Sequence, residues 1–244
     1  MFGHDLWIET NVATLLPRDC VQVAFKLGNC EHGKQTFRTA DLIDRDGVTA
    51  FEMQPDGRRI LISKQLVPSS DVGGGFWHME RELSQPGVTW FCHTLDQTVR
   101  HGGTDMRGVV SAKAFVWVRE DGNASGRPPS LKKMGLPLEL ILQSSAVPSA
   151  EQAEPIRVQL LLHDKPLPNT PVSFLPNARD WKSEDPKQYD RITDSDGIAD
   201  FKARHPGLFL ITARHVGPND DPSGPSEVYY STSLTLRVGR AMTK

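Results

Sequence analysis

Apolar and polar residues alternate along several short stretches of the chain, which is the pattern of half-buried β-strands. The clearest of these stretches are residues 20–27, 88–95, 156–163 and 229–238. Further strands are expected at residues 5–9, 48–53, 109–118 and 136–142. No stretch of about 12 residues has helical periodicity, and a short helix is expected only at Met79–Leu83. The pattern therefore predicts an all-β fold.

Aspartate–glycine pairs mark the expected turns. They occur at residues 46–47, 56–57 and 196–197, and they suit tight hairpins because glycine readily adopts a positive φ. The third pair predicts a β-hairpin over Thr193–Phe201 with Asp196-Gly197 at its tip. The aspartates of this segment are interpreted as turn residues rather than calcium ligands, because the calcium-loop pattern fails at its twelfth position. Residues Gln97–Gly108 are polar and are expected to form a surface loop.

The length of the chain suits two domains. Its 244 residues are enough for one large or two ordinary domains. The segment Glu120–Lys133 is polar and contains Gly, Ser and Pro, so it is the expected connection between them. We expect an N-terminal β-sandwich over residues 1–122 and a C-terminal β-sandwich over residues 134–240.

Composition excludes several classes of function. The net charge of −2 and the pI of about 6.4 do not call for a nucleic-acid partner. No apolar run approaches the ~20 residues of a membrane span, and the residues after Met1 lack the features of a signal peptide. No nucleophile elbow, phosphate loop or dinucleotide fingerprint occurs, so we expect a non-enzymatic protein.

The chain has three cysteines, at positions 20, 30 and 92. An odd count argues against a full disulfide framework. Cys20 and Cys30 either pair across a hairpin or stay free as small apolar groups.

Both ends of the chain resemble known protein families. Residues 165–172, Thr193–Phe201 and 206–213 resemble the carboxypeptidase regulatory-like, or transthyretin-like, β-sandwich, which is related to immunoglobulin-like folds. The segment His4-Asp-Leu-Trp-Ile-Glu9 resembles the start of the mature chain in a family of exported bacterial two-domain proteins of unassigned function. Members are often described as periplasmic components of nickel or cobalt uptake. The resemblance covers nearly the whole chain and implies a periplasmic or extracellular location.

The histidines are the candidate metal ligands, because imidazole is a favoured ligand for nickel, cobalt, copper and zinc. His4, beside Asp5, comes first because the resemblance places it at the mature N-terminus, where an α-amino group and an imidazole together could chelate a metal. His215 ends a predicted strand and matches a histidine of the family. His93 and His101 flank a polar stretch that contains further acidic residues. The other histidines are interpreted as surface residues: His32, His78, His163 and His205.

Two functions are therefore expected as alternatives. The first is an exported, non-enzymatic binding protein for a divalent transition metal, nickel or cobalt before zinc or copper. Its partner would be the metal ion or a membrane transporter component. The second is a structural or interaction module of the cell envelope that binds protein or polysaccharide without metal.

Overall fold

The computed structural model describes residues 5–28, 36–37, 48–71, 74–101, 104–120, 133–144, 154–176, 186–219, 221 and 223–239. Within these ranges β-strands predominate, and the helical turns are two short 3-10 segments, Ser63–Gln65 (η2) and Pro186–Tyr189 (η4). The all-β prediction is confirmed. In the same ranges, no helix has the length and apolar character needed to cross a membrane.

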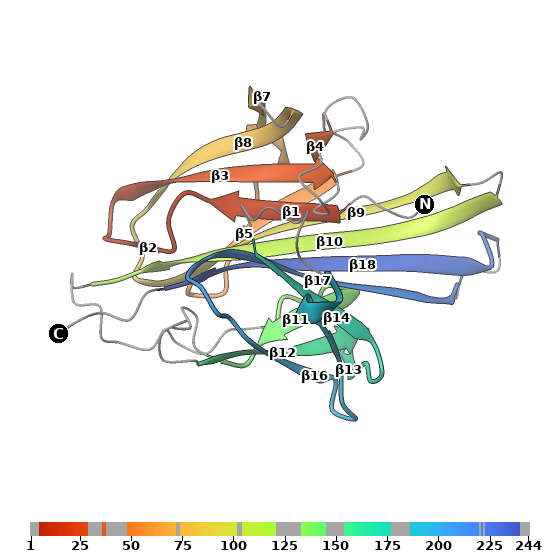
Figure 1. Cartoon of the computed structure of the whole chain (residues 1–244). Helices are drawn as coiled ribbons and strands as arrows, with labels where there is room; N and C mark the ends of the chain where they lie inside the picture. Colours follow the sequence, from red (N-terminus) through yellow and green to blue (C-terminus); the bar gives the residue numbers. More distant parts are fainter. Residues whose placement is uncertain are drawn as a thin grey trace.

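The strands form three stacked layers, which we call the upper, central and lower sheets (Figure 1). The upper sheet contains β1 (Asp5–Thr10), β3 (Asp19–Gly28), β4 (Thr36–Phe37), β7 (Val67–Asp71) and β8 (Gly74–Leu83). The lower sheet contains β11 (Leu138–Leu142), β12 (Pro155–Leu162), β13 (Lys165–Pro166) and β16 (Ile198–Lys202).

The central sheet has nine strands in the order β15-β14-β17-β18-β10-β9-β5-β6, with β2 beside β10. They are β2 (Thr14–Leu15), β5 (Val48–Met53), β6 (Arg59–Leu61), β9 (Gly87–His101), β10 (Thr104–Val118), β14 (Pro171–Pro176), β15 (Asp190–Ile192), β17 (Gly207–Pro218) and β18 (Glu227–Val238). Strands β10 and β18 are parallel and pair from Arg107 opposite Val228 to Ala114 opposite Thr235.

That parallel pair joins strands from the two halves of the chain into one sheet. The expected connection at Glu120–Lys133 lies almost entirely outside the described residues, so the division into domains 1–122 and 134–240 stays a prediction. The structure adds that any such domains would share the central sheet.

Both faces of the central sheet are buried. On β9, Trp90 and Cys92 point into the core shared with the lower sheet, whereas Phe91 and Leu95 point into the core shared with the upper sheet. Side chains alternate between the faces of a strand, so one strand supplies two cores. Val88 lies on the same face as Trp90 and Cys92, as the alternation over residues 88–95 implies.

Two local predictions are wrong. Gln97–Gly108 is not a loop, because it belongs to the long hairpin of β9 and β10, which pair as far as His101 opposite Thr104. Met79–Leu83 is not a helix, because it ends β8 and pairs with β3. Met79 and Leu83 are both buried, and their spacing of four residues fits a strand face as well as a helical one.

The Thr193–Phe201 segment forms a turn but not a hairpin. β15 pairs with β14 in the central sheet, and β16 pairs with β12 in the lower sheet, so the turn links two layers. Oδ1 of Asp194 accepts the backbone N–H groups of Asp196 and Ile198, both at 2.9 Å. Gly197 has a φ of 72°, and a Cβ there would lie 2.6 Å from the carbonyl oxygen of Leu160. The interpretation of Asp194 as a turn residue is confirmed.

The other two aspartate–glycine pairs differ in outcome. Residues 56–57 do form the turn between β5 and β6, which pair from Phe51 to Met53. Residues 46–47 lie outside the described part of the chain, as does Cys30. Cys20 is exposed and Cys92 is buried, and both are free thiols.

Candidate functional site

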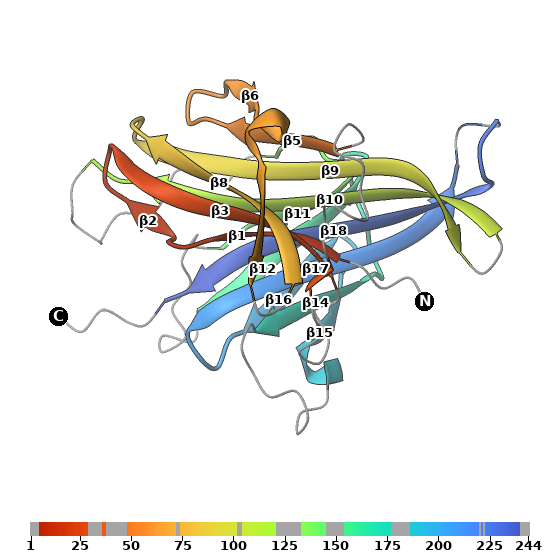
Figure 2. The ribbon, with the colours of Figure 1, turned by 90° about the horizontal axis from the view of Figure 1, so that it is seen from above.

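Four strands of the central sheet project past both covering sheets (Figure 1 and Figure 2). We call this region the sheet end. It consists of residues 96–101 of β9, 104–109 of β10, 214–218 of β17 and 227–230 of β18. Its described side chains include the polar or aromatic residues Asp96, Arg107, Arg214, His215 and Tyr230.

Asp5 lies at the upper face of this region. Its carboxylate is buried and accepts two hydrogen bonds from Nη2 of Arg214, at 2.9 and 2.8 Å. The contact brings the start of β1 against the residue that precedes His215 in β17. Two predicted ligand regions from opposite ends of the sequence are thereby brought together, although Asp5 itself serves as the partner of Arg214. His4 lies outside the described residues.

His215 lies on the lower face of the sheet end. It is the cross-strand partner of Tyr230, and the two rings are stacked with centroids 6.4 Å apart and an interplanar angle of 28°. Arg214 and His215 point to opposite faces of β17, as consecutive residues of a strand do. The Asp5 and His215 side chains are therefore separated by the thickness of the strand.

A second histidine, His163, contacts the same tyrosine from the lower sheet. Its ring packs edge-on against Tyr230 with centroids 5.4 Å apart, and Nε2 lies 3.1 Å from the tyrosine hydroxyl oxygen. We refer to His163, His215 and Tyr230 as the His–Tyr–His cluster. His163 was expected at the surface, and it is indeed exposed. Its contact with Tyr230 was not expected, because that contact depends on how the lower sheet docks.

The backbone of the turn that carries His163 is unusual. His163 forms, with Asp164, the two-residue turn between β12 and β13, in which Leu162 pairs with Lys165. The φ angles of His163 and Asp164 are 45° and 70°, values that turns of this kind usually give to asparagine and glycine. Two non-glycine residues with positive φ side by side store backbone strain.

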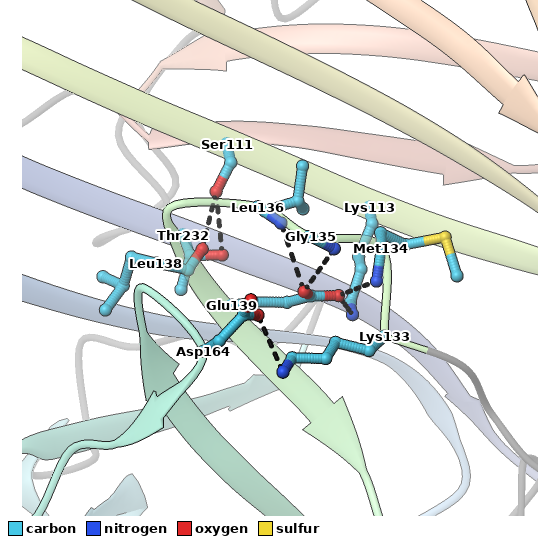
Figure 3. Close-up of polar contacts among 10 residues, drawn as sticks. All are labelled: Ser111, Lys113, Lys133, Met134, Gly135, Leu136, Leu138, Glu139, Asp164 and Thr232. Carbon is cyan, nitrogen blue, oxygen red and sulfur yellow. Dashed lines mark hydrogen bonds and ion pairs between the residues drawn. The ribbon is translucent and has the colours of Figure 1, made fainter. Parts of the chain in front are cut away.

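The strained turn is fastened to the segment that precedes β11 (Figure 3). The backbone N–H of His163 donates to the carbonyl oxygen of Pro137 at 2.8 Å, and Nζ of Lys133 lies 2.8 Å from Oδ1 of Asp164. The first contact holds the backbone of the turn that carries His163 against the segment before β11.

That segment is itself held by Glu139, whose carboxylate accepts three consecutive backbone N–H groups (Figure 3). Met134 donates to Oε1 at 2.7 Å, and Gly135 and Leu136 donate to Oε2 at 3.0 and 3.2 Å. Gly135 has a φ of 73°, which turns its N–H toward the carboxylate. Successive N–H groups that converge in this way form a binding site for an anion.

Lys113 of β10 completes this arrangement from the central sheet. Its Nζ lies 2.6 Å from Oε1 of Glu139, and the two side chains are 0% and 1% exposed. Burial lowers the pKa of Lys113, whereas the neighbouring Glu139 carboxylate opposes that change. The contact between Lys113 and Glu139 joins β10 of the central sheet to β11 of the lower sheet, so we interpret the pair as an anchor for the lower sheet.

The remaining predicted ligands lie apart from the cluster. His93 is fully buried in the upper core between Phe25 and Trp77, whose ring centroids are 5.6 and 6.2 Å from its own. Burial lowers its pKa to about 4. A metal ion could reach this imidazole only if the upper core opened. The backbone of His101 ends β9, but its side chain is outside the described part of the structure.

A charged pair occupies the β9–β10 part of the sheet end. Nε and Nη2 of Arg107 donate to the two carboxylate oxygens of Asp96 at 2.8 and 2.6 Å, and this partner raises the pKa of Arg107. The guanidinium group of Arg107 is therefore already paired with a carboxylate of its own chain. Within the residues that the structure describes, no three His, Cys, Asp or Glu side chains gather as a metal-binding group.

The family is identified by sequence comparison. Residues 1–217 match the family model described as a domain of unknown function, DUF4198. The chain belongs to the DUF4198 family. A comparison of this DUF4198 chain with curated protein sequences found no match.

Comparison with solved structures found distant similarities. A DUF4785 family protein from Legionella pneumophila has a TM-score of 0.29 and 11% identity, over 85% of this chain and 51% of that protein. Salmonella alpha-2-macroglobulin has a TM-score of 0.26 and 12% identity, over 96% of this chain and 15% of that protein. The D00-D0 domain of intimin has a TM-score of 0.25 and 12% identity, over 96% and 99%. The DUF4198 chain thus spans about half of the Legionella protein, and these likenesses are too distant to carry an argument.

Proposed function

We propose that this chain is an exported, non-enzymatic binding protein whose cargo is a divalent transition metal, nickel or cobalt. The observation that carries the proposal is the His–Tyr–His cluster, in which imidazoles from two different sheets contact one phenol ring. Imidazole nitrogen is a donor that suits borderline divalent ions, and two imidazoles lie against the same tyrosine ring here. Zinc and copper are the alternatives that the same donors would accept.

The strained turn supports a functional role for His163. A turn with His163 and Asp164 at positive φ, 45° and 70°, is less stable than one with asparagine and glycine. Strain of this kind persists where the surroundings hold it, and it is found often at ligand sites. The fastening of the turn by Pro137 and Lys133 supplies such surroundings.

The roles of the individual residues follow from their positions. His163 and His215 would supply the metal-binding nitrogens, and Tyr230 would orient the His163 ring through its hydroxyl group. Asp5 would anchor the start of β1 beside β17. His4 remains a candidate for a further ligand on the sequence motif alone. His101 is a second such candidate, from the end of β9.

The proposal also includes export from the cytoplasm and a membrane transporter component as the partner. The motif at His4–Glu9 supports a periplasmic or extracellular location, and the projecting sheet end would leave the metal accessible to a membrane transporter component. The transthyretin-like character of the C-terminal half is likewise proposed, on the motifs at residues 165–172 and 206–213.

Metal titration of purified protein tests the proposal. Nickel, cobalt, copper and zinc would be titrated by calorimetry into the natural chain, His163→Ala, His215→Ala and the control His205→Ala, which changes an exposed histidine away from the cluster. We expect at least one ion to bind the natural chain and the control equally, and both cluster variants at least tenfold more weakly. If the cluster variants bind like the control, the proposed site is wrong. If none of the four proteins binds any ion, the alternative of an interaction module without metal replaces the proposal.

A further inference from the structure

Gly217 lies on the same face of β17 as His215, two residues further along the strand. It is opposite Val228 in β18, next to the pair formed by His215 and Tyr230. A glycine inside a strand weakens it, because glycine loses more conformational freedom on folding than other residues and contributes no side chain to packing. Its presence beside the His–Tyr–His cluster therefore needs a physical reason.

The backbone does not supply that reason. Glycines with positive φ occur at six described positions in this chain, and Gly217 is not among them. Its backbone conformation is one that alanine also adopts.

Packing does not supply the reason either. A Cβ at position 217 would lie 3.4 Å from Nε2 and 3.6 Å from Cδ2 of His215, and 3.8 Å from Cε2 of Tyr230. These are ordinary van der Waals contacts, so alanine would fit beside both rings without a clash. What the glycine leaves is room for a methyl-sized group next to the Nε2–Cδ2 edge of the imidazole.

We propose that Gly217 forms the opening of the site and limits the site to small ligands. A ligand the size of a metal ion would pass beside this glycine to reach Nε2 of His215. This inference rests on the proposed function. It adds the route by which the metal ion enters and the nitrogen atom of His215 that binds it. A larger ligand would be excluded by the rings of His215 and Tyr230 on one side of the glycine. A strand interior often has glycine at a place where a ligand approaches closely.

A graded series of substitutions at position 217 tests the inference. Gly217→Ala and Gly217→Val place one and then three carbon atoms beside Nε2, and the matched control Val216→Ala changes the neighbouring residue, whose side chain points to the other face of β17. The nickel, cobalt, copper and zinc affinities of each variant would be measured together with its thermal unfolding midpoint. We expect about tenfold weaker binding for Gly217→Ala and a larger loss for Gly217→Val. The control should bind as the natural chain does, and neither Gly217 variant should unfold at a lower temperature.

The outcomes separate this inference from the proposed function. If His215→Ala binds metal as tightly as the natural chain, the proposed function fails and this inference fails with it. If His215→Ala binds weakly while Gly217→Val binds like the natural chain, only the role of Gly217 is overturned. Nitrogen chemical shifts of the His215 ring on metal addition give a second readout that does not depend on affinity. A shift centred on Nε2 supports the inference, and one centred on Nδ1 contradicts it.

Discussion

Nε2 of His163 lies 3.1 Å from the hydroxyl oxygen of Tyr230, and this contact joins a turn of the lower sheet to the projecting end of the central sheet. The two residues come from distant parts of the sequence. His163 reaches this position from a turn whose φ angles of 45° and 70° favour other residues. The turn that positions this imidazole is therefore less stable than one built from the favoured residues.

Relieving that strain should make the protein more stable and weaken its binding of metal. The double variant His163→Asn with Asp164→Gly places the favoured pair in the turn, so the free energy of unfolding should rise by about 1 kcal/mol or more. It also removes the exposed contact between Lys133 and Asp164, which contributes little. Metal affinity should fall to that of His163→Ala. Chemical denaturation and calorimetric titration measure the two effects, and a variant that is more stable and binds normally would contradict a binding role for His163.

The buried pair of Lys113 and Glu139 should be essential for stability. Glu139→Gln leaves the Lys113 ammonium group in the core without an opposite charge, and the loss expected for breaking such a pair is about 3–5 kcal/mol. Urea denaturation measures the change in unfolding free energy.

A matched substitution at the surface controls for the loss of charge alone. Asp200→Asn breaks the exposed pair with Arg157, whose side chains are 43% and 51% exposed, and it should change stability little because water screens the interaction. Equal effects of the two substitutions would show that burial of the Lys113–Glu139 pair is not what makes it important.

His93 should make the protein sensitive to acid. Burial lowers its pKa from the ordinary 6.5 to about 4, so between these values the unfolded chain binds a proton that the folded protein does not. The contribution of neutral His93 to the free energy of unfolding therefore has its full value above pH 6.5. It declines as the pH falls toward 4, by about 3 kcal/mol in total. Below pH 4 both states are protonated and the decline ends.

A variant without the imidazole isolates this effect. Unfolding free energies of the natural chain and His93→Leu would be measured from pH 7.5 to pH 4, and the difference between the two curves should change over the window from 6.5 to 4. A difference that stays constant with pH would mean that His93 does not remain neutral in the folded protein.

The two described cysteines should differ in reactivity. Cys20 is exposed, whereas burial raises the pKa of Cys92 to about 12, and the thiolate is the reactive form. Brief treatment with iodoacetamide at pH 8 should label Cys20 and leave Cys92 unlabelled until the protein is unfolded in urea. Peptide mass mapping distinguishes the two sites, and rapid labelling of Cys92 in the folded protein would contradict its place in the core.

The alternation of apolar residues predicted most strands because period two is a local property of the chain. Residues 20–27 and 229–238 both became strands, β3 and β18. The same reasoning failed at Met79–Leu83, where a short segment fits two periodicities, and at Gln97–Gly108, where polarity was interpreted as a loop. In that hairpin the side chains are polar because the sheet projects into water, although the backbone is paired throughout.

The candidate site was predicted only in part. Asp5 and His215 were both named from the sequence. Asp5 contacts Arg214, the residue before His215, but the Asp5 and His215 side chains lie on opposite faces of β17, and the side chain of His93 is in the upper core. The contact between the exposed His163 and Tyr230 was not predicted, because it depends on the docking of the lower sheet.

The order of residues along the chain was enough to predict the local features: an all-β chain, the positions of most strands and the turn chemistry around Asp194 and Gly197. These depend on side-chain alternation and on the φ angles that individual residues tolerate. The folded molecule was needed to show that β15 and β16 belong to different sheets, that β10 and β18 run parallel, and that His163 contacts Tyr230. Pairing between distant strands follows from burying both faces of the central sheet at once, and no local pattern specifies which partners achieve it.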